Sequence, residues 1–355
     1  MTFDSRRPAA SSSIVIAGAG SVGCHVGAHL AAAGRGVTLL LREPLAKAIA
    51  RHGLRMSDLD GRDEVLPPDA LKLALDPATA FRSADVVLVT VKSRDTAAMA
   101  QSIAAHAPAG AIVVSLQNGV ENAEILRQGL GRDYRVVDAM VPFNVVQTKK
   151  DGDAPHVHRA TSGTIQIEGG VAGLRDLLNV LGAPVAEHDD IDAALWGKLL
   201  VNLNNALNAL SDLPLIEQLG DRRWRLLISR QMLEGLAVLA AAGIRPAPVE
   251  GLPPRLIAFA LSLPDILFRL AARGMMAIDK TARSSMWEDL RAGRPTEIDY
   301  IQGEIVRLAE KHGIAAPLNR QVMQLIKKAE IAGQGSPALP PERSPGRYKA
   351  ATWAP

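Results

Sequence analysis

A glycine-rich loop between a buried strand and a helix constrains this chain more than any other feature of its sequence. Residues 18–23 form a complete G-x-G-x-x-G pattern, after an apolar run at residues 14–17 and before a helical stretch that ends near Gly34. The first glycine permits a tight turn, the second lets backbone N–H groups approach a pyrophosphate, and the third lets the helix pack on the strand. The start of such a helix binds anions. The pattern predicts a dinucleotide site, against the alternative of a glycine-rich turn without a ligand. The residues of this site are Gly18, Ala19, Gly20, Ser21, Val22 and Gly23.

Five short apolar runs indicate a sheet of buried strands. They alternate with helical stretches, as in a parallel sheet covered by helices, and they are rich in β-branched residues. We therefore predict an α/β, Rossmann-type domain. Around Ser162-Gly163, residues 159–168 alternate polar and apolar side chains, which predicts an antiparallel hairpin that closes the domain. The five predicted strands are residues 14–17, 37–41, 86–91, 112–116 and 136–141.

The second predicted strand ends at Arg42, where an NAD-specific site has an acid that binds the ribose 2′-hydroxyl. A planar guanidinium with several donors suits a 2′-phosphate instead. We therefore predict that NADP(H) is preferred over NAD(H), with NADPH as the reductant. Two alternatives stay open: Glu43 could take over the position, or Arg42 could be a plain surface arginine.

After residue 189 the strand patterns stop and helical periodicity takes over, at residues 192–210, 222–242 and 296–312. A chain of 355 residues is long enough for two domains. We predict a flexible start, an NADP-binding Rossmann domain, an all-α domain and a proline-rich, disordered tail. They cover residues 1–13, 14–188, 189–333 and 334–355, respectively.

Two polar segments follow predicted strands at the carboxyl edge of the sheet, where open α/β sheets bind ligands. Lys92 follows one strand, and Asn118 lies in the segment Gln117-Asn118-Gly119 after the next. Both are candidates to face the cofactor and the substrate. The alternative for Asn118-Gly119 is a favourable turn with no ligand.

The charge balance and the apolar runs exclude two classes of partner. The chain has 40 basic and 37 acidic side chains, and its formal charge of +3 gives no bulk basic surface for nucleic acid. The cluster Arg222, Arg223, Arg225 and Arg230 is interpreted as a solvated helix face. No apolar run reaches the roughly 18–20 residues that cross a bilayer, so no membrane partner is expected.

The single cysteine, Cys24, cannot form an internal disulfide, and we expect a cytoplasmic location and a packed thiol rather than a nucleophile. His156 and His158 share one face of a strand. No Cys, Asp or Glu cluster accompanies them at metal-site spacing, so we predict no metal.

Lys198 and Asn202 lie four residues apart in a stretch that is apolar almost all round, which predicts a buried helix with both side chains on one face. A buried ammonium is costly unless it meets a partner or a ligand. The functional interpretation is a site for an anion and a carbonyl group. The alternative is a lysine that extends to the surface.

Glu297 opens the last predicted helix and lies off its apolar stripe. It is either a general acid, which donates a proton to the oxygen left when hydride attacks a ketone, or a residue that compensates the helix dipole. Thr296 with Asp299 resembles a capping box, which favours the second interpretation. Upstream, Ser285 is a candidate to bind a substrate carboxylate, and a helix N-cap is its alternative.

Taken in order, these segments resemble the ketopantoate reductase family (2-dehydropantoate 2-reductase). The resemblance covers about residues 14–330, and the last three of its segments are distinctive. It implies a Rossmann domain, an all-helical domain like that of 6-phosphogluconate dehydrogenase, and NADPH and substrate between them. The segments are residues 18–23, Val91-Lys92, Gln117-Asn118-Gly119, residues 196–202, Ser284-Ser285-Met286 and residues 294–301.

The resemblance also implies roles for single residues. The catalytic lysine of the family falls on Lys198, its catalytic acid on Glu297, and its substrate-binding asparagine and serine on Asn202 and Ser285. Lys92 and Asn118 match its cofactor and active-site positions, and Arg42 matches the basic residue that meets the 2′-phosphate. The pattern departs from the family at Ala206, where a second asparagine is usual, and near Leu215, where a polar substrate contact is usual.

We therefore predict an NADPH-dependent reductase that converts 2-dehydropantoate to (R)-pantoate, on the pathway to pantothenate and coenzyme A. Hydride goes to the C2 carbonyl, Lys198 polarises that carbonyl, Glu297 delivers the proton, and Asn118, Asn202 and Ser285 orient the substrate. The predicted partner is a small 2-oxo acid, and a homodimer is the assembly considered. Two alternatives stay open, a related reductase of another 2-oxo or 3-oxo acid and a non-catalytic NADP(H)-binding sensor.

Overall fold

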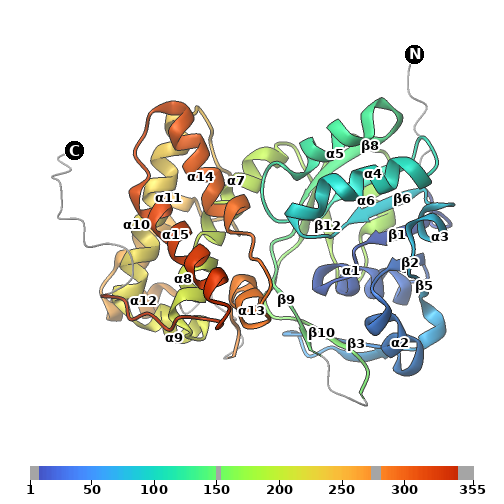
Figure 1. The fold of residues 1–355 in the computed structure, drawn as a ribbon, viewed down its shortest axis with the longest axis horizontal. Coiled ribbons are helices and arrows are strands. Elements are labelled where there is room, and N and C mark those ends of the chain that lie inside the picture. Colours follow the sequence, from blue (N-terminus) through green and yellow to red (C-terminus); the bar gives the residue numbers. More distant parts are fainter. Residues whose placement is uncertain (1–7, 149–152, 273–280, 343–355) are drawn as a thin grey trace. The chain divides into compact units, whose positions relative to one another are not determined.

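The computed structural model describes residues 8–148, 153–272 and 281–342. The chain divides into two compact units, Met1–Asp192 and Ala193–Pro355 (Figure 1). This boundary lies four residues beyond the one expected after residue 188. Residues 1–7 of the predicted flexible start and residues 343–355 of the predicted tail lie outside the described residues.

The first unit is built on an eight-stranded sheet whose central strands are parallel. All five predicted strands are present and adjacent in it, because fully buried β-branched runs pair best in the middle of a sheet. β11 closes the sheet by pairing antiparallel to β8 and parallel to β12. The order of strands is β12 (Val185–His188), β11 (Ile165–Glu168), β8 (Arg135–Met140), β7 (Ile112–Ser115), β6 (Val86–Val89), β1 (Ser13–Ala17), β2 (Gly36–Leu40) and β5 (Lys72–Ala74).

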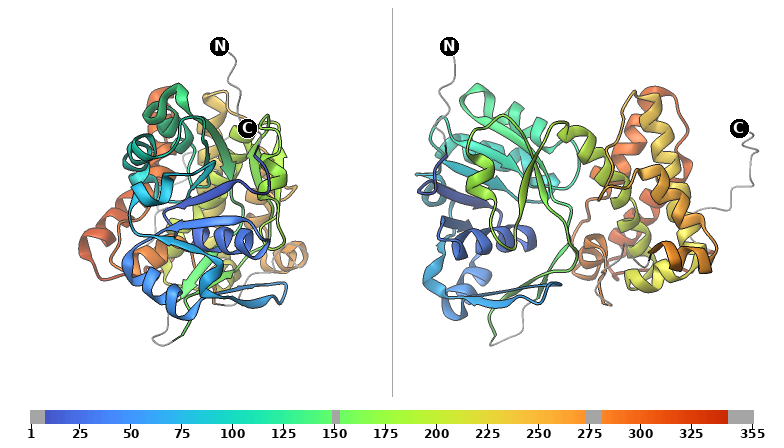
Figure 2. Two further views of the ribbon diagram at one scale, coloured as in Figure 1. Left: turned by 90° about the vertical axis from the view of Figure 1, so that its right-hand side faces the viewer. Right: turned by 180° about the vertical axis from the view of Figure 1, so that it is seen from behind.

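Helices cover both faces of this sheet (Figures 1 and 2). Alternate residues of one strand belong to different cores, since Ile14 and Ile16 of β1 pack on one face and Val15 on the other. The first face is covered by α1 (Ser21–Ala32), α2 (Glu43–His52) and α6 (Leu174–Leu178). The second face is covered by α3 (Pro77–Phe81), α4 (Thr96–His106) and α5 (Asn122–Leu130).

The first unit also contains a second, four-stranded sheet, and this sheet takes up part of the segment predicted as a hairpin at residues 159–168. Its order is β4 (Asp63–Leu66), β3 (Leu54–Asp58), β10 (His156–Arg159) and β9 (Val145–Thr148), and β10 pairs parallel with β3. β10 and β11 therefore belong to different sheets, and the hairpin prediction was wrong. Alternating side chains predict that one face of a strand is buried, but they do not say which strand will be its partner.

The second unit contains only helices among its described residues. Its longest, α10 (Arg222–Ala241), packs against α11 (Pro254–Ser262), α14 (Ile298–His312) and α15 (Pro317–Ala332). The α/β and all-α fold class is thereby confirmed. The other helices are α7 (Ile191–Asn202), α8 (Asn204–Ser211), α9 (Leu215–Gly220), α12 (Asp265–Ala272) and α13 (Ser285–Arg291).

In two segments of this unit the observed structure differs from what the sequence patterns predict. The helix expected at residues 192–210 is two helices, α7 and α8, with a turn at Leu203 between them. In the described part of the predicted tail, the N–H of Leu339 donates to the carbonyl oxygen of Leu210 at 2.8 Å, and Glu342 pairs with Arg223.

Candidate active site

The three glycines of the predicted dinucleotide loop have different surroundings. Gly18 has a φ of +90°, and a Cβ there would lie 2.3 Å from Cγ1 of Val91, so only glycine fits. A Cβ on Gly20 would meet only the oxygen of Gly18, at 4.0 Å, which leaves open space beside the turn. A Cβ on Gly23 would lie 2.8 Å from Cγ2 of Ile16, because α1 packs closely on β1 there. The loop therefore has room for a ligand at its second glycine.

This loop lies where the order of the sheet reverses, since β1 has β2 on one side and β6 on the other. Such a switch point is where open α/β sheets bind nucleotides. The hydroxyl of Thr90, just after β6, donates to the oxygen of Gly18 at 2.8 Å and fixes the turn. The segments after β1 and β6 are thus joined by a direct hydrogen bond.

A buried polar network joins the segments that carry Lys92 and Asn118. Gln117 Nε2 donates to the oxygen of Val91 at 3.0 Å, and Asn122 Nδ2 donates to the oxygen of Asn118 at 2.6 Å. Ser93 Oγ donates to the same Asn118 oxygen at 2.9 Å. Lys92 and Asn118, both half-buried, are thereby held on neighbouring segments beyond β6 and β7.

The sequence analysis proposed roles for none of the three residues Ser93, Thr96 and Asn122 of this network. Their only signal in the sequence is a set of small polar residues placed after two neighbouring strands. Asn122 receives a hydrogen bond from Thr96 Oγ1 at 2.9 Å, and Thr96 receives one from Gln117 Nε2 at 2.7 Å. Such networks are set by side chains that meet in space, which spacing along the chain does not reveal.

Arg42 and Glu43 have different surroundings at the end of β2. Arg42 is exposed, and no partner for its guanidinium lies among the described residues. Glu43 forms an ion pair with Lys47, at 2.7 Å between Oε1 and Nζ, within α2. Of the two residues, Arg42 is therefore the one available to a ligand.

Lys198 and Asn202 lie one turn apart on α7, as predicted. The helix runs close to a neighbouring segment, since a Cβ on Gly197 would lie 2.5 Å from the oxygen of Ala247. Asn202 is only 8% exposed. A hydrogen bond between its amide and a ligand would form in a place with little water, where such bonds are stronger than in bulk solvent.

Burial lowers the pKa of Lys198 to about 8, and the nearby charge of Glu250 opposes this shift. The residue as a whole is half-buried. At neutral pH the ammonium is still mostly charged, yet it is poorly hydrated. Such a cation interacts strongly with a carbonyl or carboxylate oxygen.

Glu297 is 5% exposed and occupies the residue before the first turn of α14, with φ −95° and ψ 27°. The capping box proposed as its alternative does not form. The N–H of Thr296 donates to Oε1 of Glu330 at 2.7 Å, and Asp299 pairs with Lys327 instead of reaching back to Thr296. A buried carboxyl group at this position fits the general-acid interpretation.

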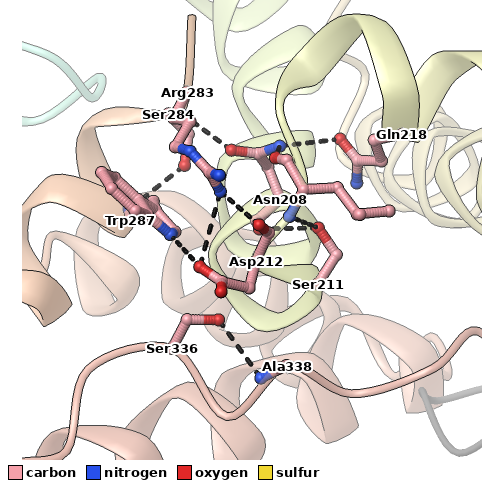
Figure 3. A network of polar contacts seen from close by, with 10 residues as sticks. Asn208, Ser211, Asp212, Gln218, Arg283, Ser284, Trp287, Ser336 and Ala338 are labelled. Atoms are coloured by element: carbon pink, nitrogen blue, oxygen red, sulfur yellow. Dashed lines mark hydrogen bonds and ion pairs between the residues drawn. The ribbon is translucent and has the colours of Figure 1, made fainter. Parts of the chain in front are cut away.

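Ser285 is the first helical residue of α13 and is half-buried, and its hydroxyl has no partner within the residues that the structure describes. The helix is capped by Ser284 instead, whose Oγ accepts the N–H of Trp287 at 3.2 Å, so the N-cap alternative for Ser285 was wrong. Figure 3 shows what holds this segment: Asn208 Oδ1 accepts the N–H of Ser284 at 2.8 Å.

Asn208 is fully buried and was not singled out from the sequence. Its Nδ2 donates to Oε1 of Gln218 at 3.1 Å (Figure 3). The same Nδ2 donates to the oxygen of Leu213 at 2.9 Å. Ser284 Oγ in turn donates to the oxygen of Asn205 at 2.8 Å. These bonds fix the start of α13 against α8.

One hydrogen bond links the helix that follows Glu297 to the end of α7. Gln302 Nε2 on α14 donates to the carbonyl oxygen of Leu203 at 2.7 Å, directly after Asn202. Lys198, Asn202, Ser285 and Glu297 therefore belong to one unit with connected supports. The predicted nucleotide-binding residues belong to the other unit.

Several other predicted features have structural roles. Arg225 is 1% exposed and pairs with Asp265 at 2.7 Å, so the interpretation of its cluster as a solvated face was wrong for this residue. His156 and His158 both contact Ser57 Oγ at 2.7 Å. Burial raises the pKa of the Cys24 thiol to about 12, which makes it a poor nucleophile.

Two features are absent among residues 8–148, 153–272 and 281–342. No group of three or more His, Cys, Asp or Glu side chains there is arranged to hold a metal ion. No described helix is both long and apolar enough to cross a bilayer.

Family models match both parts of the chain, as "Ketopantoate reductase PanE/ApbA" over residues 14–170 and as the C-terminal part of the same family over residues 190–330. The 2-dehydropantoate 2-reductase of Halobacterium salinarum is 30% identical over 334 residues, which cover 90% of this chain and 99% of that protein. A crystal structure of a PanE/ApbA family ketopantoate reductase from Ralstonia eutropha JMP134 matches with a TM-score of 0.74 at 32% identity, over 91% of this chain and 99% of that one. The structure of a dimeric ketopantoate reductase from Staphylococcus aureus shares the fold, with a TM-score of 0.66 at 20% identity over 90% and 99% of the two chains.

The fold and the loop after β1 define an oxidoreductase of the nicotinamide-dependent dehydrogenase class, rather than a non-catalytic sensor. Within that class, this chain belongs to the ketopantoate reductase family. The activity of the family belongs to the route to pantothenate and coenzyme A.

Proposed function

We propose that this chain reduces 2-dehydropantoate to (R)-pantoate with NADPH. The observation that supports this most is the pair on α7, a poorly hydrated cation at Lys198 and a mostly buried amide at Asn202, one helical turn apart. A 2-oxo acid offers a carbonyl oxygen and a carboxylate oxygen to such donors in one small molecule. The family of the chain supports the same reaction type.

Each residue has a distinct part in the proposed reaction. Lys198 donates to the C2 carbonyl oxygen and draws electron density toward it, and Glu297 holds the proton that this oxygen receives. Asn118, Asn202 and Ser285 orient the substrate through their amide and hydroxyl groups. Glu297 is 5% exposed, so little water reaches its carboxyl group.

The residues around the glycine loop fit NADPH. The open space at Gly20 suits a pyrophosphate, Arg42 suits the 2′-phosphate, and Lys92 and Asn118 lie on the segments beyond the next two strands. When bound, NADPH supplies the hydride that the C2 carbon accepts.

A related reductase of another 2-oxo or 3-oxo acid is the second candidate, because Ala206 and Leu215 are apolar where the family has polar contacts. Ala206 is fully buried, and Leu215 is half-buried at the start of α9. Both positions would favour a more apolar substrate. Steady-state kinetics with NADPH and a series of 2-oxo acids of increasing side-chain size separate the two candidates. A higher kcat/KM for a bulkier acid than for 2-dehydropantoate would overturn the first.

The proton-donor role is tested by Glu297→Ala. General acid catalysis contributes roughly 10²–10⁴-fold, so kcat should fall by at least about a hundredfold while NADPH still binds with its normal affinity. Fluorescence titration with NADPH measures the second quantity. Normal turnover in this variant would remove Glu297 from the mechanism.

Two further features of the proposal concern assembly and location. The dimeric relative from Staphylococcus aureus and the exposed apolar side chains Phe259 and Ile266 on α11 and α12 support a homodimer, which light scattering at micromolar concentration would test. A cytoplasmic location is proposed because the only cysteine of the chain forms no disulfide.

A further inference from the structure

Glu330 makes an unusual pair of contacts with the residue that precedes Glu297. Its Oε1 accepts two hydrogen bonds from Thr296, one from the backbone N–H and one from the hydroxyl, both at 2.7 Å. Thr296 is buried, and the Glu330 side chain, on the last turn of α15, is 15% exposed. A carboxylate that accepts two bonds in a partly buried place fixes its donors firmly.

The same threonine also fixes the residue that follows Glu297. Thr296 Oγ1 accepts the N–H of Ile298 at 3.2 Å while it donates to Glu330. The backbone N–H groups on both sides of Glu297 are therefore held, that of Thr296 by Glu330 and that of Ile298 by the Thr296 hydroxyl. Glu297 itself has φ −95° and ψ 27°.

The second carboxylate oxygen of Glu330 is also constrained. Oε2 lies 3.8 Å from Nζ of Lys327, one turn earlier on α15, and Lys327 also pairs with Asp299 on α14. Glu330 is thus oriented by a cation on one oxygen and by Thr296 on the other. These contacts join the start of α14 to the end of α15.

We infer that Glu330 is a positioning residue for the proposed reaction: through Thr296 it sets the backbone of Glu297 and with it the place of the acid. The inference rests on the proposed role of Glu297 as proton donor. Because Glu330 acts on the acid rather than on substrate binding, its loss should lower kcat and leave both KM values nearly unchanged. A displacement of about 1 Å at a reacting group costs up to about a hundredfold in rate.

The test compares four single variants in the full chain. Glu330→Ala removes the acceptor, Glu330→Gln retains a carbonyl oxygen in its place, and Thr296→Val removes only the hydroxyl. Glu310→Ala is the matched control, because it removes another contact between α14 and α15, the ion pair of Glu310 with Arg320 at 2.9 Å, far from Glu297 along α14. Thermal unfolding and NADPH binding establish that each variant is folded.

We expect kcat to fall about tenfold to a hundredfold in Glu330→Ala, and to return to within about threefold of the starting protein in Glu330→Gln. The kcat of Thr296→Val should also be lower than that of the starting protein. This variant keeps the inference testable if Glu330→Ala does not fold. Glu310→Ala should have normal kcat. A folded Glu330→Ala or Thr296→Val with normal kcat, or an equal loss in Glu310→Ala, would overturn the inference.

A double variant separates this inference from the proposed function. If Glu297→Ala alone loses turnover, adding Glu330→Ala should cause no further loss, because there is no acid left to position. A further tenfold loss would mean that Glu330 acts elsewhere, and the inference alone would fail. If Glu297→Ala keeps normal turnover, the proton-donor role and the inference both fail.

Discussion

At Lys198 the environment changes both the charge and the chemistry of a common side chain. Desolvation lowers its pKa to about 8, so the proton leaves near the upper end of the physiological range. If the cation polarises the substrate carbonyl, activity is present below this pKa and is lost as the pH rises through it. We therefore expect kcat/KM for the oxo acid to fall tenfold per pH unit above about pH 8.

The measurement is a pH profile of kcat/KM from pH 6 to 10. Lys198→Arg is the matched variant, because its guanidinium stays charged over this range. It should be slower throughout but lose the decline above pH 8. A decline of the same position and slope in Lys198→Arg would show that another group causes it.

Arg42 carries the prediction on cofactor preference. In Arg42→Ala the guanidinium that would face the 2′-phosphate is gone, so KM for NADPH should rise about tenfold or more while KM for NADH changes little. The charge-matched control is Arg51, also on the α2 segment but in its last turn. Equal changes for the two cofactors in Arg42→Ala would show that this arginine does not select between them.

At the scale of elements, the strands that are buried on both faces were predicted from the sequence, and the strands of the second sheet were not. The five central strands were predicted because each is a nearly continuous apolar run rich in β-branched residues. β4, with the sequence Asp-Glu-Val-Leu, and β10, with His-Val-His-Arg, have no such run, so the second sheet was missed and β10 was paired with the wrong strand. The spacing of Lys198 and Asn202 was predictable from helix geometry. The hydrogen bond that supports the end of α7 was not predictable, since Gln302 lies 99 residues from its partner Leu203.

The close approach of α7 to the segment around Ala247 gives a prediction for this element. A Cβ added at Gly197 would lie 2.5 Å from a backbone oxygen, so Gly197→Ala must push α7 away from that segment and displace Lys198 beside it. Overpacking of this kind costs about 1–3 kcal/mol. We expect a lower melting temperature and a reduced kcat, with unchanged affinity for NADPH.

Gly220→Ala is the control, because a Cβ there meets nothing within 4 Å and the residue belongs to the same unit. Gly220→Ala should leave the melting temperature and kcat unchanged. If Gly197→Ala melts and turns over like the starting protein, the helix has room to adapt and the contact does not position Lys198.

At the scale of the whole molecule, two histidines on α1 make stability depend on pH. Burial lowers the pKa of His25 to about 3, with a further contribution from His29, and burial lowers the pKa of His29 to about 4, with a further contribution from Arg62. The native protein keeps both rings neutral, whereas the unfolded chain protonates them near pH 6.5. Their contribution to stability is therefore complete above pH 6.5 and is lost progressively as the pH falls toward 4 and 3.

Between pH 7 and pH 5 the free energy of unfolding should drop by about 2 kcal/mol per buried ring. Urea unfolding at the two pH values measures this. His29→Gln should reduce the pH dependence by about half, and His106→Gln, at an exposed position, should not change it. An identical drop in all three proteins would assign the pH dependence to other groups.

The parallel pairing of β10 with β3 has a consequence for synthesis of the chain. Met56 lies opposite Val157, so this sheet unites segments about a hundred residues apart. During translation the β3–β4 ribbon leaves the ribosome long before its other neighbour exists, and its open edge is exposed for all that time. At about 5–20 residues per second this interval lasts several seconds, in which the nascent chain is most at risk of pairing with another chain.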